Sequence, residues 1–224
     1  MTLTLMVGLR ADLLRREPEI AEQLAAEFAE INALLEKNGL APHLEPDECE
    51  VWSVDMPSFS SLHYLRRLAA NVHLKGELPT PGDETNLDDD EPTDRYYELA
   101  SETGGFLSNL LGVKTPSDRP FDQLIVHRDN DGFYVPIDFP EPIPYESRAS
   151  GPGWIGSSIA LERECEKLIE ALGLPADIDL DGVVQTGEES ETWQRYATES
   201  FCVVALREAC RRAARTGAAL VFVG

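Results

Sequence analysis

The stretch Ala218–Val223, AALVFV, decides the fold that this sequence predicts. An uninterrupted apolar run is typical of a strand buried on both faces, because a half-exposed strand alternates polar and apolar residues. At the other end of the chain, Thr2–Gly8, TLTLMVG, is also apolar enough to lie inside a sheet. We expect the two strands to lie side by side at the sheet centre, which would make residues 1–224 a single domain.

Between these strands the sequence alternates helical periodicity with acidic or Pro-rich loops. Apolar residues recur at spacings of three and four, which predicts helices, in the segments 18–39, 58–75, 93–111, 157–173 and 191–215. The segment Gln123–Phe139 predicts a β-hairpin, because Asp131-Gly132 suits a two-residue turn. The fold class predicted is α+β, with a small mixed or antiparallel sheet of about four strands covered by four to five helices.

The net charge of −22 over 224 residues restricts the function classes. Residues 76–150 hold 17 acidic and 5 basic residues, a net charge of −12, so the middle third dominates the electric field. Such a field repels nucleic-acid phosphates and anionic membranes and attracts basic proteins or cations. We therefore expect neither nucleic acid nor a membrane as a partner, and a basic protein as the most natural one.

The densest acidic run lies in the segment 76–92, which reads as a mobile insertion because it is Pro-containing and nearly free of apolar residues. Its partner-binding candidates are Asp88, Asp89, Asp90 and Glu91. Like-charge blocks of this kind also serve as plain solvated loops. If they dock a partner, charge complementarity would raise the association rate and fix specificity.

In general character, acidic and without a catalytic signature, the chain resembles bacterial immunity or antitoxin-type proteins. That resemblance implies a cytoplasmic binding protein that docks a basic partner such as a toxin or nuclease. No GxSxG, HExxH or Walker motif is present. We therefore expect a binding protein rather than an enzyme.

A calcium-binding module is an alternative, because Asp177, Asp179, Asp181 and Glu188 have the spacing of the calcium loop D-x-D-x-D-G-x5-E. The resemblance to EF-hand proteins covers twelve residues. Gly173 and Pro175 separate the loop from the preceding helix, unlike in an EF-hand, and no second loop is present. Ca²⁺ is the one cofactor that the sequence suggests.

Two further segments could hold small ligands. Gly156, Ser157 and Ser158 begin a predicted helix, whose free amides could bind an anion. His63 and Arg67 lie four residues apart on one helical face and could line the pocket of an unrecognised enzyme. Each pattern has a plainer interpretation, a serine helix cap and an exposed polar face.

The location expected from the sequence is the cytoplasm. The first residues lack the basic region and cleavage site of a signal peptide, and no apolar run approaches the length of a membrane span. The four cysteines show no metal-binding or disulfide spacing, which favours reduced, buried thiols.

Overall fold

A mixed six-stranded sheet forms the centre of the protein, in a computed structural model that describes residues 3–81, 90–103, 119–127, 132–147, 151–184 and 191–224. The strand order is β2-β1-β6-β3-β5-β4. Neighbouring strands are antiparallel except β3 and β5, which are parallel. The strands are β1 (Thr4–Val7), β2 (Trp52–Asp55), β3 (Gly132–Val135), β4 (Ile143–Ser147), β5 (Gly151–Ser157) and β6 (Leu220–Val223).

The predicted pairing of the two ends of the chain is confirmed. Strands β1 and β6 lie side by side, with Leu5 opposite Phe222 and Val7 opposite Leu220. Both occupy interior positions of the sheet, because β2 lies on the outer side of β1 and β3 on the far side of β6. The two strands with continuous apolar sequence, β1 and β6, are therefore strands with a neighbouring strand on each side.

The described residues form nine helices: α1 (Leu9–Arg16), α2 (Pro18–Lys37), α3 (Ser61–Lys75), α4 (Glu91–Thr103), α6 (Asp122–Ile125), α7 (Ser158–Leu172), α8 (Leu180–Val184), α9 (Thr192–Arg195) and α10 (Ala197–Thr216). The predicted α+β class is therefore confirmed. The prediction of about four strands was too low, because the sheet has six. In the described part of the chain, no helix combines the length and apolarity that crossing a membrane requires.

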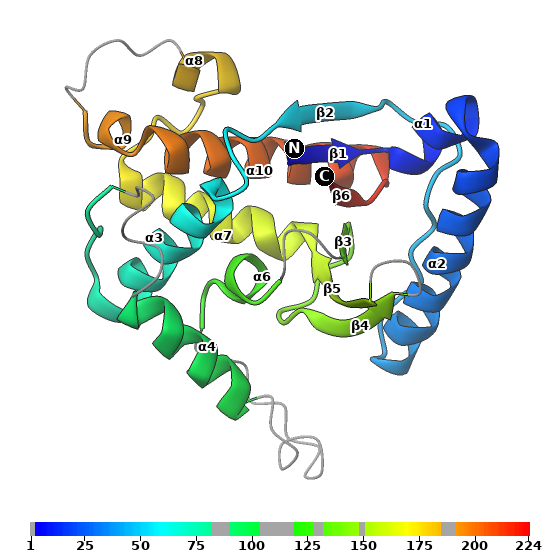
Figure 1. The fold of residues 1–224 in the computed structure, drawn as a ribbon, viewed down its shortest axis with the longest axis horizontal. Coiled ribbons are helices and arrows are strands. Elements are labelled where there is room, and N and C mark those ends of the chain that lie inside the picture. Colours follow the sequence, from blue (N-terminus) through cyan, green and yellow to red (C-terminus); the bar gives the residue numbers. More distant parts are fainter. Residues whose placement is uncertain (1–2, 82–89, 104–118, 128–131, 148–150, 185–190) are drawn as a thin grey trace.

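The sheet is covered on both faces, and the two faces bury separate hydrophobic clusters. On one face α3, α7 and α10 pack over Leu5, Tyr134 and Leu220. On the other, α2 packs over alternate residues of the same strands, including Phe133 and Val221. Figure 1 shows α2 at one side of the molecule and the three other helices across the sheet from it. This alternation follows from the period of two along a strand.

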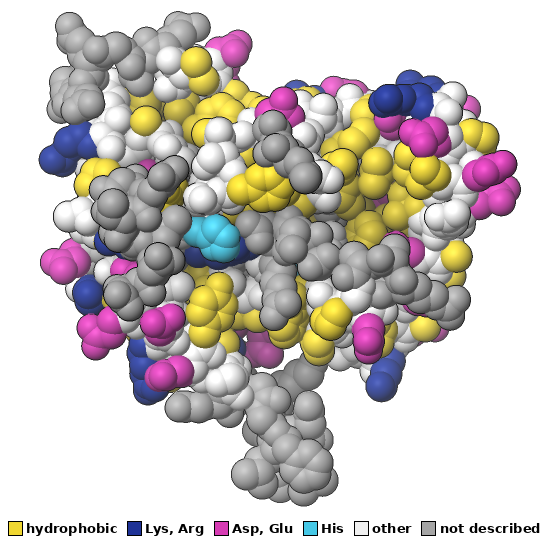
Figure 2. Space-filling view, in the orientation of Figure 1, with side chains coloured by type: hydrophobic (Ala, Val, Ile, Leu, Met, Phe, Trp, Pro, Cys, Tyr) yellow, Lys and Arg dark blue, Asp and Glu magenta, His cyan; other side chains and the backbone are white. Residues whose placement is uncertain are grey.

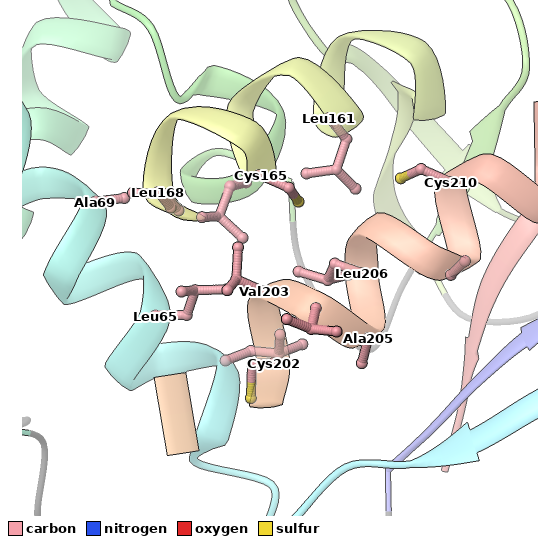
Figure 3. Packing of buried hydrophobic residues seen from close by; sticks show 14 of the residues in the cluster. Leu65, Ala69, Leu161, Cys165, Leu168, Cys202, Val203, Ala205, Leu206 and Cys210 are labelled. Atoms are coloured by element: carbon pink, nitrogen blue, oxygen red, sulfur yellow. The ribbon is translucent and has the colours of Figure 1, made fainter. Parts of the chain in front are cut away.

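The larger cluster is centred on α10, as the wide apolar face of that helix predicts. Figure 3 shows Val203 and Leu206 of α10 directed toward Leu65 of α3 and Leu168 of α7. All four side chains are at most 1% exposed. The neighbouring Cys165 thiol, also buried, is free, as are the other three cysteines.

The predicted hairpin at 123–139 is wrong. Its first half contains the short helix α6, and its second half contains β3, which pairs with β5 and β6. Asp131, in the expected turn, lies outside the described residues. The apolar alternation around Leu124 and Val126 reads as a strand, but a short fully buried helix needs the same residue types.

Helix α6 crosses the interior, and side chains of other elements satisfy its polar backbone. Glu164 of α7 accepts the amides of Gln123 and Leu124 at 2.9 and 2.8 Å. Arg66 of α3 donates to the Leu124 carbonyl at 2.9 Å, and the Tyr134 hydroxyl donates to the Gln123 carbonyl at 2.7 Å. Among the described residues, every buried side-chain nitrogen and oxygen has a hydrogen-bond partner, as stable interiors require.

Three strands lie in segments whose Pro-, Gly- or acid-rich sequence predicts loops. Strand β2 forms within residues 40–57, β4 forms at Ile143–Ser147, and β5 forms in the Gly-rich segment that follows. Strands β2 and β4 are the edge strands of the sheet. Edge strands need little continuous apolar sequence, because one side of their backbone has no neighbour. Pro144, which cannot donate a ladder hydrogen bond, is tolerated in β4 for that reason.

We predict that Gly156→Ala lowers the free energy of unfolding by about 1–3 kcal/mol. A Cβ atom at this position would lie 2.3 Å from Cδ1 of Tyr134. That ring cannot retreat, because it stacks on His127 at 3.9 Å and its hydroxyl is hydrogen-bonded. Urea unfolding measures the loss. Gly182→Ala is the control, because its Cβ would come no closer than 3.1 Å to a neighbouring side chain, that of Ile178, and we expect a smaller effect. Equal losses from the two substitutions would contradict the packing.

We predict that the stability difference between the wild type and Glu164→Gln shrinks as pH rises from 5 to 8. Burial raises the pKa of Glu164 well above its usual value, against the two backbone amides that lower it. A raised folded-state pKa stabilises the protein below the unfolded pKa, and that contribution is lost as pH rises toward the folded value. Urea midpoints at several pH values test this; a difference that grows with pH would mean that the carboxylate is ionised in the folded protein.

Candidate functional site

Helix α2 combines a buried face with an exposed acidic face. Its apolar residues Leu24, Phe28, Ile31 and Leu35 recur at spacings of three and four and pack on the sheet. The opposite face therefore points to solvent. Carboxylates are exposed along it, at Glu19, Glu22 and Glu36, and at Glu17 just before the helix.

These four carboxylates keep their charge uncompensated. Within the described part of the chain, no lysine, arginine or histidine forms an ion pair with any of them. The arginines of the neighbouring α1 are engaged elsewhere: Arg16 pairs with Asp12 at 3.1 Å and Arg10 with Asp47 at 2.7 Å. Helix α2 itself carries five glutamates and one lysine.

Three carboxylates of α7 and α10 contrast with those of α2, because arginines neutralise them, whereas Glu170 of α7 is exposed. Arg211 binds Glu162 and Glu166 at 3.0 and 2.7 Å. Arg212 binds Glu50 and Glu208, both at 2.6 Å. The net charge of the chain is thus not distributed evenly over its helices. The face of α2 is a rigid surface on which negative charge is left unpaired.

Glu36 does not serve helix stability, whereas Glu19, in the first turn of α2, is favourably placed for the helix dipole. Glu36 lies in the last turn of α2, where a carboxylate opposes the helix dipole by about 0.3–1 kcal/mol. Glu19 and Glu22, three residues apart, are like charges on neighbouring turns and repel each other weakly. Charges that cost stability at exposed positions are typical of a functional surface.

The predicted acidic docking segment has a different arrangement from the one expected. Asp88 and Asp89 lie outside the described residues. Asp90 is turned inward: its side chain is 10% exposed and binds Arg67 at 3.0 Å. It also accepts the Thr93 hydroxyl at 2.7 Å. Glu91, the first residue of α4, is exposed. Asp90 is therefore a structural residue rather than a docking charge.

Hydrogen bonds fix the charge state of Asp90. Burial raises the pKa of this carboxyl, but the bonds from Thr93 and Asn71, together with the charge of Arg67, outweigh burial and lower it. The guanidinium of Arg67 also donates to the Thr80 carbonyl at 2.8 Å. Thr80, in the described first part of the predicted mobile insertion, is thereby bonded to α3.

The described residues of the predicted calcium loop do not form a ligand cage. Gly182, which would make the sharp turn of such a loop, lies inside α8, and Asp179 caps that helix by accepting the Gly182 amide at 2.8 Å. Asp177 and Asp181 are exposed, and Glu188 lies outside the described residues. In the described part of the chain, no three His, Cys, Asp or Glu side chains gather as metal ligands.

An arginine also lies against the backbone at the start of this loop. The guanidinium of Arg207 donates to the carbonyls of Ala176 and Ile178, on either side of Asp177. A fixed positive charge at these carbonyls repels a divalent cation. The geometry of this loop gives calcium binding no support.

The predicted anion site is buried and internally satisfied. Gly156 and Ser157 end β5, and Ser158 begins α7. The Ser157 side chain caps α7 by accepting the Ala160 amide at 3.0 Å, which confirms the serine cap. The Ser157 amide donates to the Gln123 side chain at 2.9 Å. These groups face the core rather than solvent.

His63 and Arg67 do not form one site. His63 lines a hollow of about 680 Å³ with Phe59, Tyr97 and Trp154, whereas Arg67 binds Asp90 and Thr80. Figure 2 shows the face of Figure 1 in space-filling form: hydrophobic side chains gather over its middle, and acidic side chains lie mostly near its outline.

The fold and the surface of α2 together define an acidic α+β protein with a rigid carboxylate-bearing helix. A family model described as "Putative DNA-mimic protein" matches residues 1–222. The chain belongs to this family. No match was found among curated proteins or among solved structures.

Family membership corrects two predictions from the sequence. An immunity- or antitoxin-like protein that docks an unspecified basic partner is replaced by a DNA-mimic protein, and the calcium module and the unrecognised enzyme receive no support. The expectation that nucleic acid is not a partner agrees with the family, but mimicry of DNA, which the family description names, was not among the predicted functions. The carboxylates of α2 were also missed, although glutamates opposite the apolar stripe of 18–39 could be read from the sequence.

We predict that Asp90→Asn lowers the free energy of unfolding by about 1–3 kcal/mol, because it removes a charge-assisted partner of Arg67. The neighbouring Glu91→Gln is the matched control, since it removes one charge from an exposed position and should change stability by less than about 0.5 kcal/mol. Thermal or urea unfolding compares the two. Equal effects would mean that Asp90 is as exposed as Glu91.

Proposed function

We propose that this protein binds a DNA-binding protein in place of DNA, with the carboxylates of α2 standing in for backbone phosphates. The observation that carries the proposal is a set of four exposed carboxylates on α2 and at its N-terminus, in a chain of the DNA-mimic family. They belong to Glu17, Glu19, Glu22 and Glu36, which have no ion-pair partner among the described residues. Arginine and lysine side chains that contact phosphate oxygens can make similar charge-assisted bonds to carboxylates.

The dimensions of α2 suit this role. A helix rises about 1.5 Å per residue, so the 20 residues of α2 extend about 30 Å. Glu17 and Glu36 are then roughly 28 Å apart along the axis, a span that about eight phosphates of one DNA strand occupy at about 3.4 Å each. The helix is sparser in charge than DNA, but it is as rigid as a duplex over this length. Fixed charges need no ordering when a partner binds.

The mechanism is electrostatic steering followed by exclusion of DNA. The field of a strongly negative protein draws in the basic face of a DNA-binding protein and raises the association rate. Once that face is occupied, phosphates cannot reach it. Binding should weaken as salt rises, because ions screen the charges of both partners.

We place this function in the cytoplasm. All four cysteines are free thiols, and three of them are buried. Unpaired cysteines are the usual state of proteins in a reducing compartment. DNA-binding proteins are present in that compartment as well.

The test removes the charges of α2 and compares a control with the same net charge. The variant Glu17→Gln, Glu19→Gln, Glu22→Gln, Glu36→Gln is matched by Glu77→Gln, Glu146→Gln, Glu170→Gln, Asp177→Asn, all exposed positions outside α2. Each immobilised protein is incubated with cell lysate at low salt and then eluted with duplex DNA. We predict that duplex DNA releases DNA-binding proteins from the wild type and the control, and at least about tenfold less from the α2 variant, about 1.4 kcal/mol of binding free energy.

Two results would overturn the proposal. If duplex DNA releases nothing from the wild type, the captured proteins do not use their DNA-binding face. If both variants lose binding equally, net charge alone is responsible and α2 has no special role. Circular dichroism of each variant ensures that a loss of binding is not a loss of fold.

A further inference from the structure

An apolar groove runs beside the acidic face of α2. It has a volume of about 440 Å³ and lies between α1 and α2. Leu9 and Leu13 of α1 form one wall. The α2 residues that line it are Ile20, Gln23, Leu24, Ala26, Glu27 and Glu30. The groove is therefore apolar at its base and carries carboxylates along one rim.

The groove exposes side chains that a protein normally covers. Ile20 is 43% exposed although it lies on a helix that packs against the sheet, and Leu9 and Leu13 are only half-buried. Burying apolar surface is worth about 25 cal/mol per Å². DNA has no counterpart of this groove in its phosphate backbone, so it is not explained by charge imitation.

Charge and shape together restrict what can occupy the groove. Glu19 is four residues from Gln23 and so lies on the next turn, beside the groove. A ligand lying here meets apolar side chains along its centre and carboxylates at its margin. An amphipathic helix with basic flanks has the complementary pattern, and helix-in-groove docking is a common mode of recognition.

We propose that the groove between α1 and α2 binds an amphipathic basic helix of the DNA-binding protein, with apolar side chains of that helix inserted between Leu13 and Ile20. This inference rests on the proposed function and names the part of the partner that binds. Many DNA-binding proteins present a helix to the major groove of DNA, so a basic helix is the element a DNA mimic encounters. The apolar anchor selects among basic proteins, which charge alone cannot do.

The probe is a fluorescently labelled amphipathic helical peptide of lysine, leucine and alanine, with its leucines on one face. A scrambled peptide of the same composition, whose leucines share no face, is the control ligand. Fluorescence anisotropy with the full-length protein measures both affinities. We expect the amphipathic peptide to bind about tenfold more tightly than the scrambled one; equal affinities would overturn the proposal.

Groove variants test the site itself. Ile20→Asn places a polar group in the groove, and Ala26→Leu fills it without adding polarity, so the second variant remains informative if the first unfolds. Val184→Asn is the matched control, an exposed apolar residue of α8 outside the groove. We expect both groove variants to weaken peptide binding about tenfold and the control to leave it unchanged.

The outcomes separate this inference from the proposed function. The groove variants could bind the peptide like the wild type, while the α2 charge variant no longer captures proteins that duplex DNA elutes. In that case the groove is not the anchor, and the proposed function is retained. If the groove variants lose the peptide while duplex DNA elutes nothing from the wild type, the groove binds basic helices but the proposed function fails. Light scattering tests whether a second copy of the chain covers the groove. A wild-type dimer that becomes a monomer in Ile20→Asn would show this and overturn the inference.

Discussion

The buried segment 121–127 is the constraint on which the rest of the structure depends. It places a short helix, with its polar backbone, in the interior, where an unsatisfied amide or carbonyl costs about 1–3 kcal/mol. Glu164 accepts two of its amides, Arg66 donates to two of its carbonyls, and Tyr134 donates to a third. These partners come from α7, α3 and β3, so the segment fixes three distant parts of the chain against one another.

This arrangement has a consequence for the opposite face of the sheet. Helices α3, α6, α7 and α10 all gather on one side, and among the described helices α2 carries most of the cover on the other. A helix that covers a sheet by itself presents its whole outer face to solvent. The acidic side of α2 is therefore accessible along its length, and the groove beside α1 stays open. The packing of helices on one face of the sheet thus leaves the acidic side of α2 exposed on the opposite face.

The long helices and the two strands at the ends of the chain could be predicted from the sequence, because their signals are local. The interior strand β5 and the short helices α1, α6 and α8 were not predicted. The apolar stripe beginning at Ile20, the serine cap before α7 and the continuous apolar residues of β6 each reflect an interaction within a few residues. The segment 123–139 could not, because Leu124 and Val126 suit a buried strand and a buried helix equally. The candidate site was missed for a related reason. The density of acidic residues in the sequence pointed to Asp90. Whether a carboxylate is available to a partner depends on whether it already forms an ion pair. The ion-pair partner of Asp90 is Arg67, 23 residues away in the sequence.

The sequence by itself determined the α+β class, the pairing of the two ends of the chain and a strongly negative field, because apolar pattern and net charge are properties of composition and local order. Only the tertiary structure decided where the negative charge acts. It neutralised Glu162, Glu166 and Glu208 with arginines and turned Asp90 inward, while Glu19, Glu22 and Glu36 of α2 stay exposed, without an ion-pair partner among the described residues. The physical reason is that an ion pair or a groove requires two elements to meet in space. Sequence order alone does not specify which elements those are.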